Sequence, residues 1–353
     1  MMAKPGVPLL LRRQTFKAEL SAQSLDFQSL VGRPARYDDG CMPCVMITTR
    51  ADDREADYIS LRLAAAGIPL LRIDSDRCAG AELVWDVFRG IVSVGGEQFR
   101  PRVFWSRYFS ASSIDAPAPD GIAHYVREQW GAWAESMQPP MDVVMVNRLT
   151  GRWQPSRIAQ LAAARKAGLR VPASVVTTCP GLTPDLIPGS GDLVMKSLGE
   201  HLIEETPGNA IGLFPRRVSR AELSRDRTVE SAPVLVQEFV PSSGELRINW
   251  ADGEFVAFRL DKRSMDVERL DVSEVSIERV PMPPELTGPL TLLCEQWNLQ
   301  LAAFDLLDTP WGYVFLEVNP AFDWLWLENH VEGRPVSSAV CDFLINAFEE
   351  VSS

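Results

Sequence analysis

A strand–helix–strand unit near the start of the chain constrains the fold most. Val45 to Thr48 is an apolar stretch typical of a buried strand, and Asp52 or Asp53 can cap the helix that follows it. The helix ends at Gly67, and a second apolar stretch runs from Ile68 to Ile73. Two strands that are joined through a helix lie parallel in one sheet. We therefore expect an α/β domain in this part of the chain.

The rest of the chain divides at a pair of prolines. Pro139 and Pro140 mark a boundary, so we expect the α/β domain over residues 41–140 and a second domain over residues 141–353. The second part combines short strands, amphipathic helices and two hairpins. Residues 1–40 contain scattered prolines and a turn-like YDDG segment, which predict an irregular N-terminal extension.

Composition argues against several classes of function. The net charge of −12 disfavours a general nucleic-acid-binding protein, which needs a basic surface. No apolar run reaches the ~18 residues of a membrane-spanning helix. The N-terminus lacks the apolar core and cleavage site of a signal peptide, so we expect a cytoplasmic protein. The lone Cys41-x-x-Cys44 pair has no second ligand pair nearby, which favours reduced thiols over a zinc site.

The last predicted hairpin carries three oxygen-bearing side chains. Asp305 lies on its first strand, and Glu317 and Asn319 lie two residues apart on the second, so all three can share one face. Two carboxylates and an amide suit Mg²⁺ that also binds substrate phosphates. The alternative is a buried polar cluster whose members satisfy one another by hydrogen bonds. The combination across one hairpin favours a metal site.

Three further segments can complete a phosphate site. Lys196 ends a predicted strand and can pair with phosphate oxygens, although a solvated lysine is the simpler interpretation of this residue alone. Residues 237–240 end another strand, where backbone groups can contact a nucleobase. Glu245 can accept from ribose hydroxyls, and Arg247, on the same face, can reach a phosphate or a carboxylate. An ordinary edge strand with solvated charges also fits this segment.

Taken in order, these parts resemble the ATP-grasp superfamily. The segments that carry the resemblance are Lys196, QEFV at 237–240, GELRI at 244–248, FD at 304–305 and FLEVNP at 315–320. More narrowly, residues 44–345 resemble the microviridin-type graspetide ligases, whose catalytic half is similar to RimK-type ligases. The resemblance implies a pre-ATP-grasp α/β domain followed by an ATP-grasp fold with a lid subdomain at about 185–240 and a catalytic subdomain at about 241–353.

The resemblance also implies an activity. Such ligases use ATP and Mg²⁺ to convert Asp or Glu side chains of a ribosomally made precursor peptide into acyl phosphates. They then join the activated groups to Ser or Thr hydroxyls or to Lys amines, forming macrocyclic esters or amides. The precursor peptide, leader and core together, is the expected partner, and a homodimer is compatible with this family.

The resemblance assigns roles to individual residues. Asp305, Glu317 and Asn319 correspond to the magnesium ligands. Nucleotide contacts are implied for Arg157, Lys196, Gln237, Glu238, Phe239, Val240 and Glu245. Catalytic roles are implied for Lys196, Arg247 and Arg269.

Three segments depart from the family pattern. Arg157 stands where the helix after Asn147 usually carries a lysine, and arginine is a different kind of donor. The usual D-W-R after the central hairpin is blurred into DVER, which ends at Arg269. The usual NPxGQW has become NPAFDW, with Phe322 and Asp323 in the Gly and Gln places. We expect these changes to affect the choice of substrate more than the ATP chemistry.

Two other functions remain open from sequence. The first is an ATP-grasp ligase that joins a small carboxylic acid or amino acid to an amine. The second is a non-catalytic module that binds a leader peptide or another partner, an alternative that the Arg157 substitution keeps open. A basic run can contact an acidic peptide or simply form a solvated surface. Its members are Arg216, Arg217, Arg220, Arg225 and Arg227.

Overall fold

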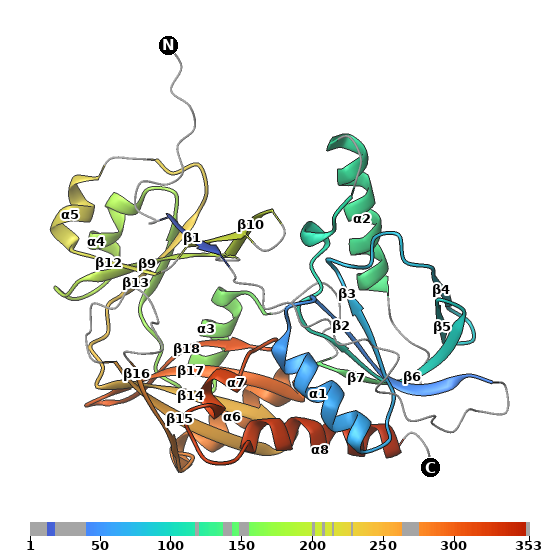
Figure 1. Cartoon of the computed structure of the whole chain (residues 1–353). Coiled ribbons are helices and arrows are strands. Elements are labelled where there is room, and N and C mark those ends of the chain that lie inside the picture. Colours follow the sequence, from blue (N-terminus) through green and yellow to red (C-terminus); the bar gives the residue numbers. More distant parts are fainter. Residues whose placement is uncertain are drawn as a thin grey trace.

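The computed structural model describes residues 13–17, 40–116, 120–136, 143–147, 155–199, 202–206, 209–213, 215–226, 229–262 and 275–350. Strands within these residues form four sheets. Figure 1 shows the six-stranded sheet at right, the five-stranded sheet at lower left and the four-stranded sheet above the latter.

The six-stranded sheet contains the predicted strand–helix–strand unit. Its strand order is β3-β2-β6-β5-β4, and β7 also pairs with β6. Pairing is parallel between β2, β3, β6 and β7 and antiparallel where the β4–β5 hairpin joins β6. The bounds are β2 Met42–Thr49, α1 Arg54–Ala65, β3 Leu70–Asp74, β4 Leu83–Asp86, β5 Ile91–Val94, β6 Glu97–Ser106, α2 Asp120–Ser136 and β7 Val144–Val146.

Local chemistry explains the start of this unit. The Asp53 side chain caps α1 by accepting a hydrogen bond from the backbone N–H of Ala56, so the expected cap is confirmed. Gly67 ends the helical turn with φ 72, a conformation that glycine adopts without strain. β7 follows the proline pair in sequence, yet it pairs with β6 and therefore belongs to this first sheet.

The five-stranded sheet is wholly antiparallel, with the order β16-β15-β14-β17-β18. Its strands are β14 Gly244–Ala251, β15 Glu254–Lys262, β16 Val275–Val280, β17 Leu301–Thr309 and β18 Gly312–Asn319. Its helices are α3 Arg157–Lys166, α6 Pro284–Gln296, α7 Leu325–Glu328 and α8 Pro335–Glu350.

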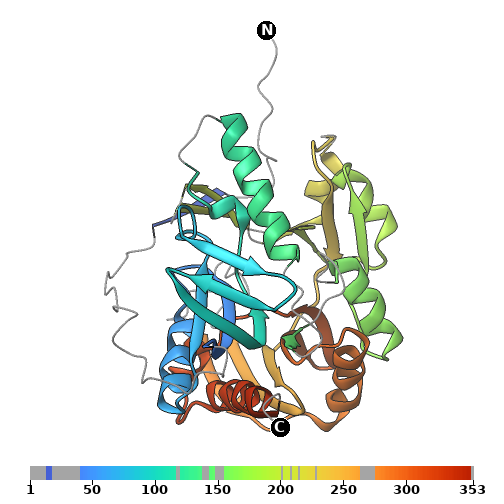
Figure 2. The ribbon, with the colours of Figure 1, turned by 90° about the vertical axis from the view of Figure 1, so that its right-hand side faces the viewer.

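Both faces of this sheet are covered by helices. One face packs on α3 and α6 through residues such as Leu161, Leu290 and Phe304. The other packs on α8, and the same apolar cluster continues to Val45 and Ile59 of the six-stranded sheet and α1. Figure 2 shows α8 running beneath the sheets. Because one apolar core spans both parts, the six-stranded and five-stranded sheets are held together as one body.

The four-stranded sheet has a smaller core of its own. It is antiparallel in the order β12-β9-β13-β8, and it packs on α4 and α5. The bounds are β8 Ser174–Thr177, α4 Thr183–Leu186, β9 Leu193–Ser197, β12 Arg216–Val218, α5 Arg220–Arg225 and β13 Val234–Glu238. The three-stranded sheet consists of β1 Arg13–Lys17, β10 Leu202–Thr206 and β11 Asn209–Leu213.

The N-terminal extension is not irregular throughout. Residues 13–17 form β1, which pairs antiparallel with β11, so the expectation for residues 1–40 is wrong for this segment. Its other residues, apart from Gly40, lie outside the described part of the chain. None of the helices among the described residues has the length and apolar character needed to cross a membrane.

Candidate active site

The β17–β18 hairpin brings the three predicted metal ligands together. Asp305 lies directly opposite Glu317, and Asn319 lies opposite Ala303. The Asn319 Nδ2 donates to Asp305 Oδ2 at 3.0 Å and to Glu317 Oε1 at 3.4 Å. A β-bulge lies immediately after Asp305, where Leu306 pairs with Phe315, and such bulges redirect side chains beside functional sites. The hairpin register therefore sets this group of three.

Two side chains fix the end of β18. Gln160 of α3 accepts from the Val318 backbone N–H at 3.0 Å and donates to the Val318 carbonyl at 3.1 Å, which covers the sheet edge. Asn147, just after β7, donates to the carbonyls of Leu301 and Pro320 at 2.7 and 3.0 Å. Glu317 and Asn319 are thus held in place by α3 on one side and by the residue that follows β7 on the other.

Each carboxylate in the hairpin faces an arginine from another element. Arg247 lies opposite Asp305, and its Nη1 is 2.7 and 2.6 Å from the two carboxylate oxygens. The Arg157 Nη1, at the start of α3, lies 3.2 Å from Glu317 Oε2. These four side chains are 14–28% exposed, so the two pairs line a partly open site. Arg157 thus reaches the site despite its departure from the family pattern.

The surroundings of the Asp305 carboxylate disfavour its charged form. Burial is the main cause that raises its pKa to about 6, the Glu317 charge adds to this, and Arg247 opposes it. A carboxylate in this condition gains from an additional nearby cation. The donor set fits Mg²⁺, because two carboxylates and an amide oxygen are hard ligands. Asn319 would only have to turn its amide group to present Oδ1.

Lys196 of the four-stranded sheet faces the same site. Burial lowers the pKa of Lys196, the Glu317 charge raises it, the Arg157 charge lowers it, and Glu245 and Asp305 also act on it. Lys196, on β9, therefore lies within electrostatic reach of residues on α3, β14, β17 and β18. The site therefore combines a lysine of the four-stranded sheet with Arg247 and the carboxylates of the five-stranded sheet and with Arg157 of α3.

The segment predicted to contact a nucleobase is built into the four-stranded sheet. Gln237 is buried and donates to a serine of β8 at 2.9 Å. The Glu238 carboxylate accepts from a backbone N–H just before β8 at 3.2 Å. The Arg217 guanidinium lies 4.0 Å from the centre of the Phe239 ring, and Val240 is buried. With these side chains used inside the protein, any nucleotide contact here falls to the backbone.

Three arginines of the basic run are bound to neighbouring residues around the four-stranded sheet. Arg216 and Arg217 form ion pairs with carboxylates at 2.9 and 2.7 Å. Arg220 donates to four backbone carbonyls at 2.6–3.0 Å. These contacts explain three of the arginines without an acidic peptide. Arg227, in the same run, and Arg269, the expected catalytic residue, lie outside the described residues.

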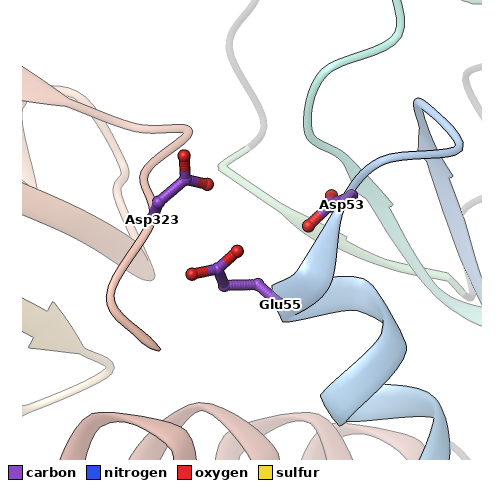
Figure 3. A group of neighbouring side chains, drawn as sticks. All are labelled: Asp53, Glu55 and Asp323. Carbon is purple, nitrogen blue, oxygen red and sulfur yellow. The ribbon is translucent and has the colours of Figure 1, made fainter. Parts of the chain in front are cut away.

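A second charged group, the junction cluster, lies where α1 and β6 meet the loop after β18. It consists of Asp53, Glu55, Arg107 and Asp323. Arg107 and Asp53 form an ion pair at 2.8 Å with both side chains fully buried. Glu55 Oε1 accepts two backbone N–H groups at the start of α7, at 2.9 and 3.0 Å. Figure 3 shows the three carboxylates converging, and their oxygens lie within 4.8 Å of one another.

The junction cluster adjoins the hairpin site through Tyr108. Tyr108 interacts electrostatically with Asp323 of the cluster and with Arg247 of the hairpin site. Sequence reasoning identified Asp53 only as a helix cap and missed Glu55, Arg107 and Tyr108. A signal was present, because the charged residue after the apolar strand VFWS stands at the carboxyl end of a parallel strand, where ligands bind in α/β sheets.

Similarity to known proteins is visible in structure and not in sequence. No family model and no curated protein matches the chain. The macrocyclase MdnC bound with precursor peptide MdnA, from Microcystis aeruginosa MRC, matches with a TM-score of 0.70 and 20% identity, over 86% of this chain and 100% of that one. A RiPP-associated ATP-grasp ligase of Chryseobacterium gregarium, in complex with ADP and a leader and core peptide, matches with 0.70 and 20%, over 86% and 97%.

The chain has the ATP-grasp fold. A third match, to D-cycloserine synthetase DcsG, has a TM-score of 0.53 and 14% identity, over 87% of this chain and 99% of that one. The expected fold class, a pre-ATP-grasp α/β domain followed by an ATP-grasp fold, is thereby confirmed. Within the ATP-grasp fold of this chain, the carboxylates of the β17–β18 hairpin lie within electrostatic reach of Lys196 of the four-stranded sheet.

Proposed function

We propose that the protein is an ATP-dependent ligase that modifies a ribosomally made precursor peptide. It activates Asp or Glu side chains as acyl phosphates and joins them to Ser or Thr hydroxyls or to Lys amines, closing ester or amide rings. The observation that supports this most is the convergence of Lys196, Arg247, Asp305, Glu317 and Asn319 on one site. Phosphoryl transfer to a carboxylate requires this combination of metal ligands and phosphate-binding cations.

The geometry supports a role for each residue in this proposal. Asp305, Glu317 and Asn319 would hold Mg²⁺, which neutralises phosphate charge when bound. Lys196 and Arg157 approach this position from the opposite sheet and from α3, and would hold the phosphates.

The remaining contacts follow the strands that lead to the site. Gln237, Glu238, Phe239 and Val240 would frame the adenine, and Glu245 would bind the ribose. Arg247, fixed on Asp305, would orient the carboxyl group that attacks, together with Arg269.

A peptide substrate is favoured over a small acid by structural similarity. The two peptide-bound neighbours match this chain with a TM-score of 0.70, whereas D-cycloserine synthetase matches with 0.53. A non-catalytic module is disfavoured, because Arg157 still contacts Glu317 and the hairpin residues are all in place. We propose a cytoplasmic enzyme with a pre-ATP-grasp domain at 41–140 and an ATP-grasp domain at 141–353. The latter would comprise a lid subdomain at about 185–240 and a catalytic subdomain at about 241–353. We also propose a homodimer, which sedimentation can test.

The test uses the peptide encoded beside the gene. Enzyme, ATP, Mg²⁺ and this peptide are incubated, and mass spectrometry is used to look for the loss of one water per ring. An unchanged peptide mass with folded enzyme would exclude a macrocyclase. Asn319→Ala should abolish ring formation without lowering Tm, and retained activity would remove Asn319 from the metal site.

The matched control is Asp252→Asn. Asp252 is exposed in the β14–β15 turn and has φ 35, a conformation that asparagine also tolerates. The control removes one charge from the same sheet but away from the site, so it should retain full activity.

A further inference from the structure

Asn249 places an amide inside an apolar part of the five-stranded sheet. The residue is only 2% exposed. Val256 of β15 and Ala303 of β17 lie directly opposite it, and Ala251 follows it on the same face of β14. All three belong to the apolar cluster that this face shares with α8. A buried amide in such surroundings lowers stability unless its donor and its acceptor both find partners.

The amide of Asn249 is bonded on one side only. Its Nδ2 donates to the Val256 carbonyl at 3.4 Å, which is a long hydrogen bond. Its Oδ1 is buried and has no hydrogen-bond partner among the described residues. Because the nitrogen and the oxygen of an amide point in different directions, the contact of Nδ2 directs Oδ1 away from Val256. An acceptor is therefore left over inside this face of the sheet.

A matching donor belongs to the neighbouring residue on the same face. Arg247 lies two positions before Asn249 on β14, so the two side chains point to the same side with their Cα atoms about 6.8 Å apart. The Arg247 Nε is also buried and without a hydrogen-bond partner in the described part of the chain. Since the residues opposite and after Asn249 are apolar, Arg247 is its adjacent polar neighbour on this face.

Asp305 alone does not fix the plane of the Arg247 guanidinium. Both of its carboxylate oxygens are bound by one nitrogen, Nη1, at 2.7 and 2.6 Å. A guanidinium that is held at two nitrogens keeps its planar fork in one orientation, whereas one that is held at a single nitrogen can pivot. The proposed Mg²⁺ would also bind the Asp305 carboxylate and so compete with Nη1. The orientation of Arg247 therefore depends on what holds its Nε.

We propose that Asn249 is a positioning residue for Arg247, acting through one buried water that accepts from Arg247 Nε and donates to Asn249 Oδ1. Two hydrogen bonds of about 2.9 Å each can join neighbouring side chains on one strand face, and buried waters typically bridge polar groups in this way. Nη1 stays on Asp305, and Nη2 is left to bind the carboxyl group that is activated. The inference rests on the proposed function, in which Arg247 orients that group.

The experiment compares three variants of β14. Asn249→Leu removes the acceptor and the donor, whereas Asn249→Asp keeps an acceptor of the same shape and loses only the Nδ2 donor. Ile248→Leu is the matched control, because Ile248 is the preceding residue and is buried on the other face of the sheet. Peptide-dependent ADP release gives kcat and KM for the precursor peptide encoded beside the gene and for ATP. A thermal melt of each variant gives Tm.

We expect Asn249→Leu to lower kcat/KM for the peptide by about 10- to 100-fold, mainly through kcat, because misplacing a reacting group by about 1 Å has an effect of this size. The KM for ATP and the Tm should stay near their wild-type values. Asn249→Asp should recover most of the activity, and Ile248→Leu should match wild type. If Asn249→Asp is as slow as Asn249→Leu, or if Tm falls together with activity, Asn249 is structural and the positioning role is wrong.

A double-mutant cycle tests whether Asn249 acts through Arg247. Arg247→Lys carries no donor at the position of Nε, so adding Asn249→Leu to it should slow turnover by no more than about twofold. A further loss as large as in the wild-type background would show that Asn249 acts on another group. A crystal structure of the wild-type enzyme should show a water within hydrogen-bond distance of Arg247 Nε and Asn249 Oδ1. A dry gap between the two atoms would overturn the proposal.

The two proposals fail in different ways. If folded wild-type enzyme releases no ADP with the peptide and leaves its mass unchanged, the proposed function fails and the inference fails with it. If the wild-type enzyme is active and Asn249→Leu turns over at the same rate, only the positioning role of Asn249 fails.

Discussion

Two of the Asp–Arg pairs among the described residues differ in what surrounds the carboxylate. Arg107 and Asp53 are fully buried at the junction of α1 and β6, whereas Arg247 and Asp305 are 14% and 27% exposed in the candidate active site. Burial raises the pKa of Asp53. The charge and hydrogen bonds of Arg107 and the hydrogen bonds from neighbouring donors lower it by more than burial raises it, so the pKa of Asp53 is depressed. The pKa of Asp305 moves the other way, to about 6.

The difference comes from the third partner. Asp53 has extra hydrogen-bond donors, Thr49 and the capped helix, that stabilise its charge. Asp305 has instead a second carboxylate, Glu317, directly across the hairpin. One carboxylate is satisfied by the protein itself and serves structure. The other is left with excess negative charge around it and is suited to a ligand of positive charge.

The strongest way to break the active-site pair is Asp305→Asn. The amide keeps the shape but removes a charged metal ligand, so peptide-dependent ATP hydrolysis should fall by about 1,000-fold or more. The variant relieves repulsion with Glu317 but also removes the counter-ion of Arg247, so the two effects on Tm oppose each other and the melt shows whether the enzyme stays folded. The measurement is coupled ADP release beside a thermal melt, with Asp252→Asn as the control. Near-normal ATP hydrolysis would show that Asp305 is not a ligand.

The grouping of the three hairpin residues was predictable from sequence. Asp305, Glu317 and Asn319 are joined by one turn, so strand periodicity alone puts them on a common face. The strand–helix–strand unit was predictable for a similar reason, because its strands and helix are adjacent in sequence. Their roles as ligands stay a prediction until the metal is measured.

The junction cluster could not be predicted from sequence, because its residues come together only in the folded protein. Asp53 and Glu55 come from α1, Arg107 follows β6, and Asp323 follows β18. No periodicity relates these segments, and their meeting depends on the apolar core shared by α8 and both sheets. The strand β1 was missed for the same reason, since its partner β11 is far along the chain.

The junction pair should respond to substitution through stability. Asp53→Ala leaves the Arg107 guanidinium buried without its counter-ion, which costs about 3–5 kcal/mol. The free energy of unfolding is measured by urea titration. Replacing both partners, Asp53→Ala with Arg107→Met, should recover much of the loss because no charge remains buried. A double variant as unstable as the single one would show that the cost comes from the lost helix cap and not from the charge.

Substitution of Arg157, which pairs with Glu317, tests the candidate active site through a smaller expected effect. In the absence of nucleotide, Arg157 competes with a metal ion for Glu317 at 3.2 Å. Arg157→Ala should therefore bind Mg²⁺ alone more tightly, by about tenfold, while it binds ATP more weakly. Calorimetry with each ligand separately measures both changes. Arg157→Lys is the matched control, because it keeps the charge and should change both affinities by only about threefold. Unchanged metal affinity in Arg157→Ala would mean that the ion pair does not hold Glu317.

The smallest expected effect is the pH dependence of the junction pair. Because the pKa of Asp53 is lower in the folded protein, its contribution to stability is present above the unfolded value of about 3.9 and is lost as pH falls through the folded value. Glu55 acts in the opposite direction, since burial, and then the Asp323 charge, raise its pKa. Its contribution is present below the unfolded value of about 4.3 and is lost as pH rises through the folded value. The two contributions therefore partly cancel between about pH 3 and 5.

Asp53→Asn removes one of these opposing contributions and exposes the other. On lowering the pH from 5 to 3, the free energy of unfolding of this variant should fall less steeply than that of wild type, with a difference of at most about 1.4 kcal/mol per pH unit. Urea titrations at each pH give the slopes, and Asp252→Asn provides the control because it removes an exposed carboxylate. Parallel slopes for Asp53→Asn and wild type would mean that Arg107 does not hold the pKa of Asp53 down. In that case the contrast with Asp305 would arise from exposure alone and not from the third partner.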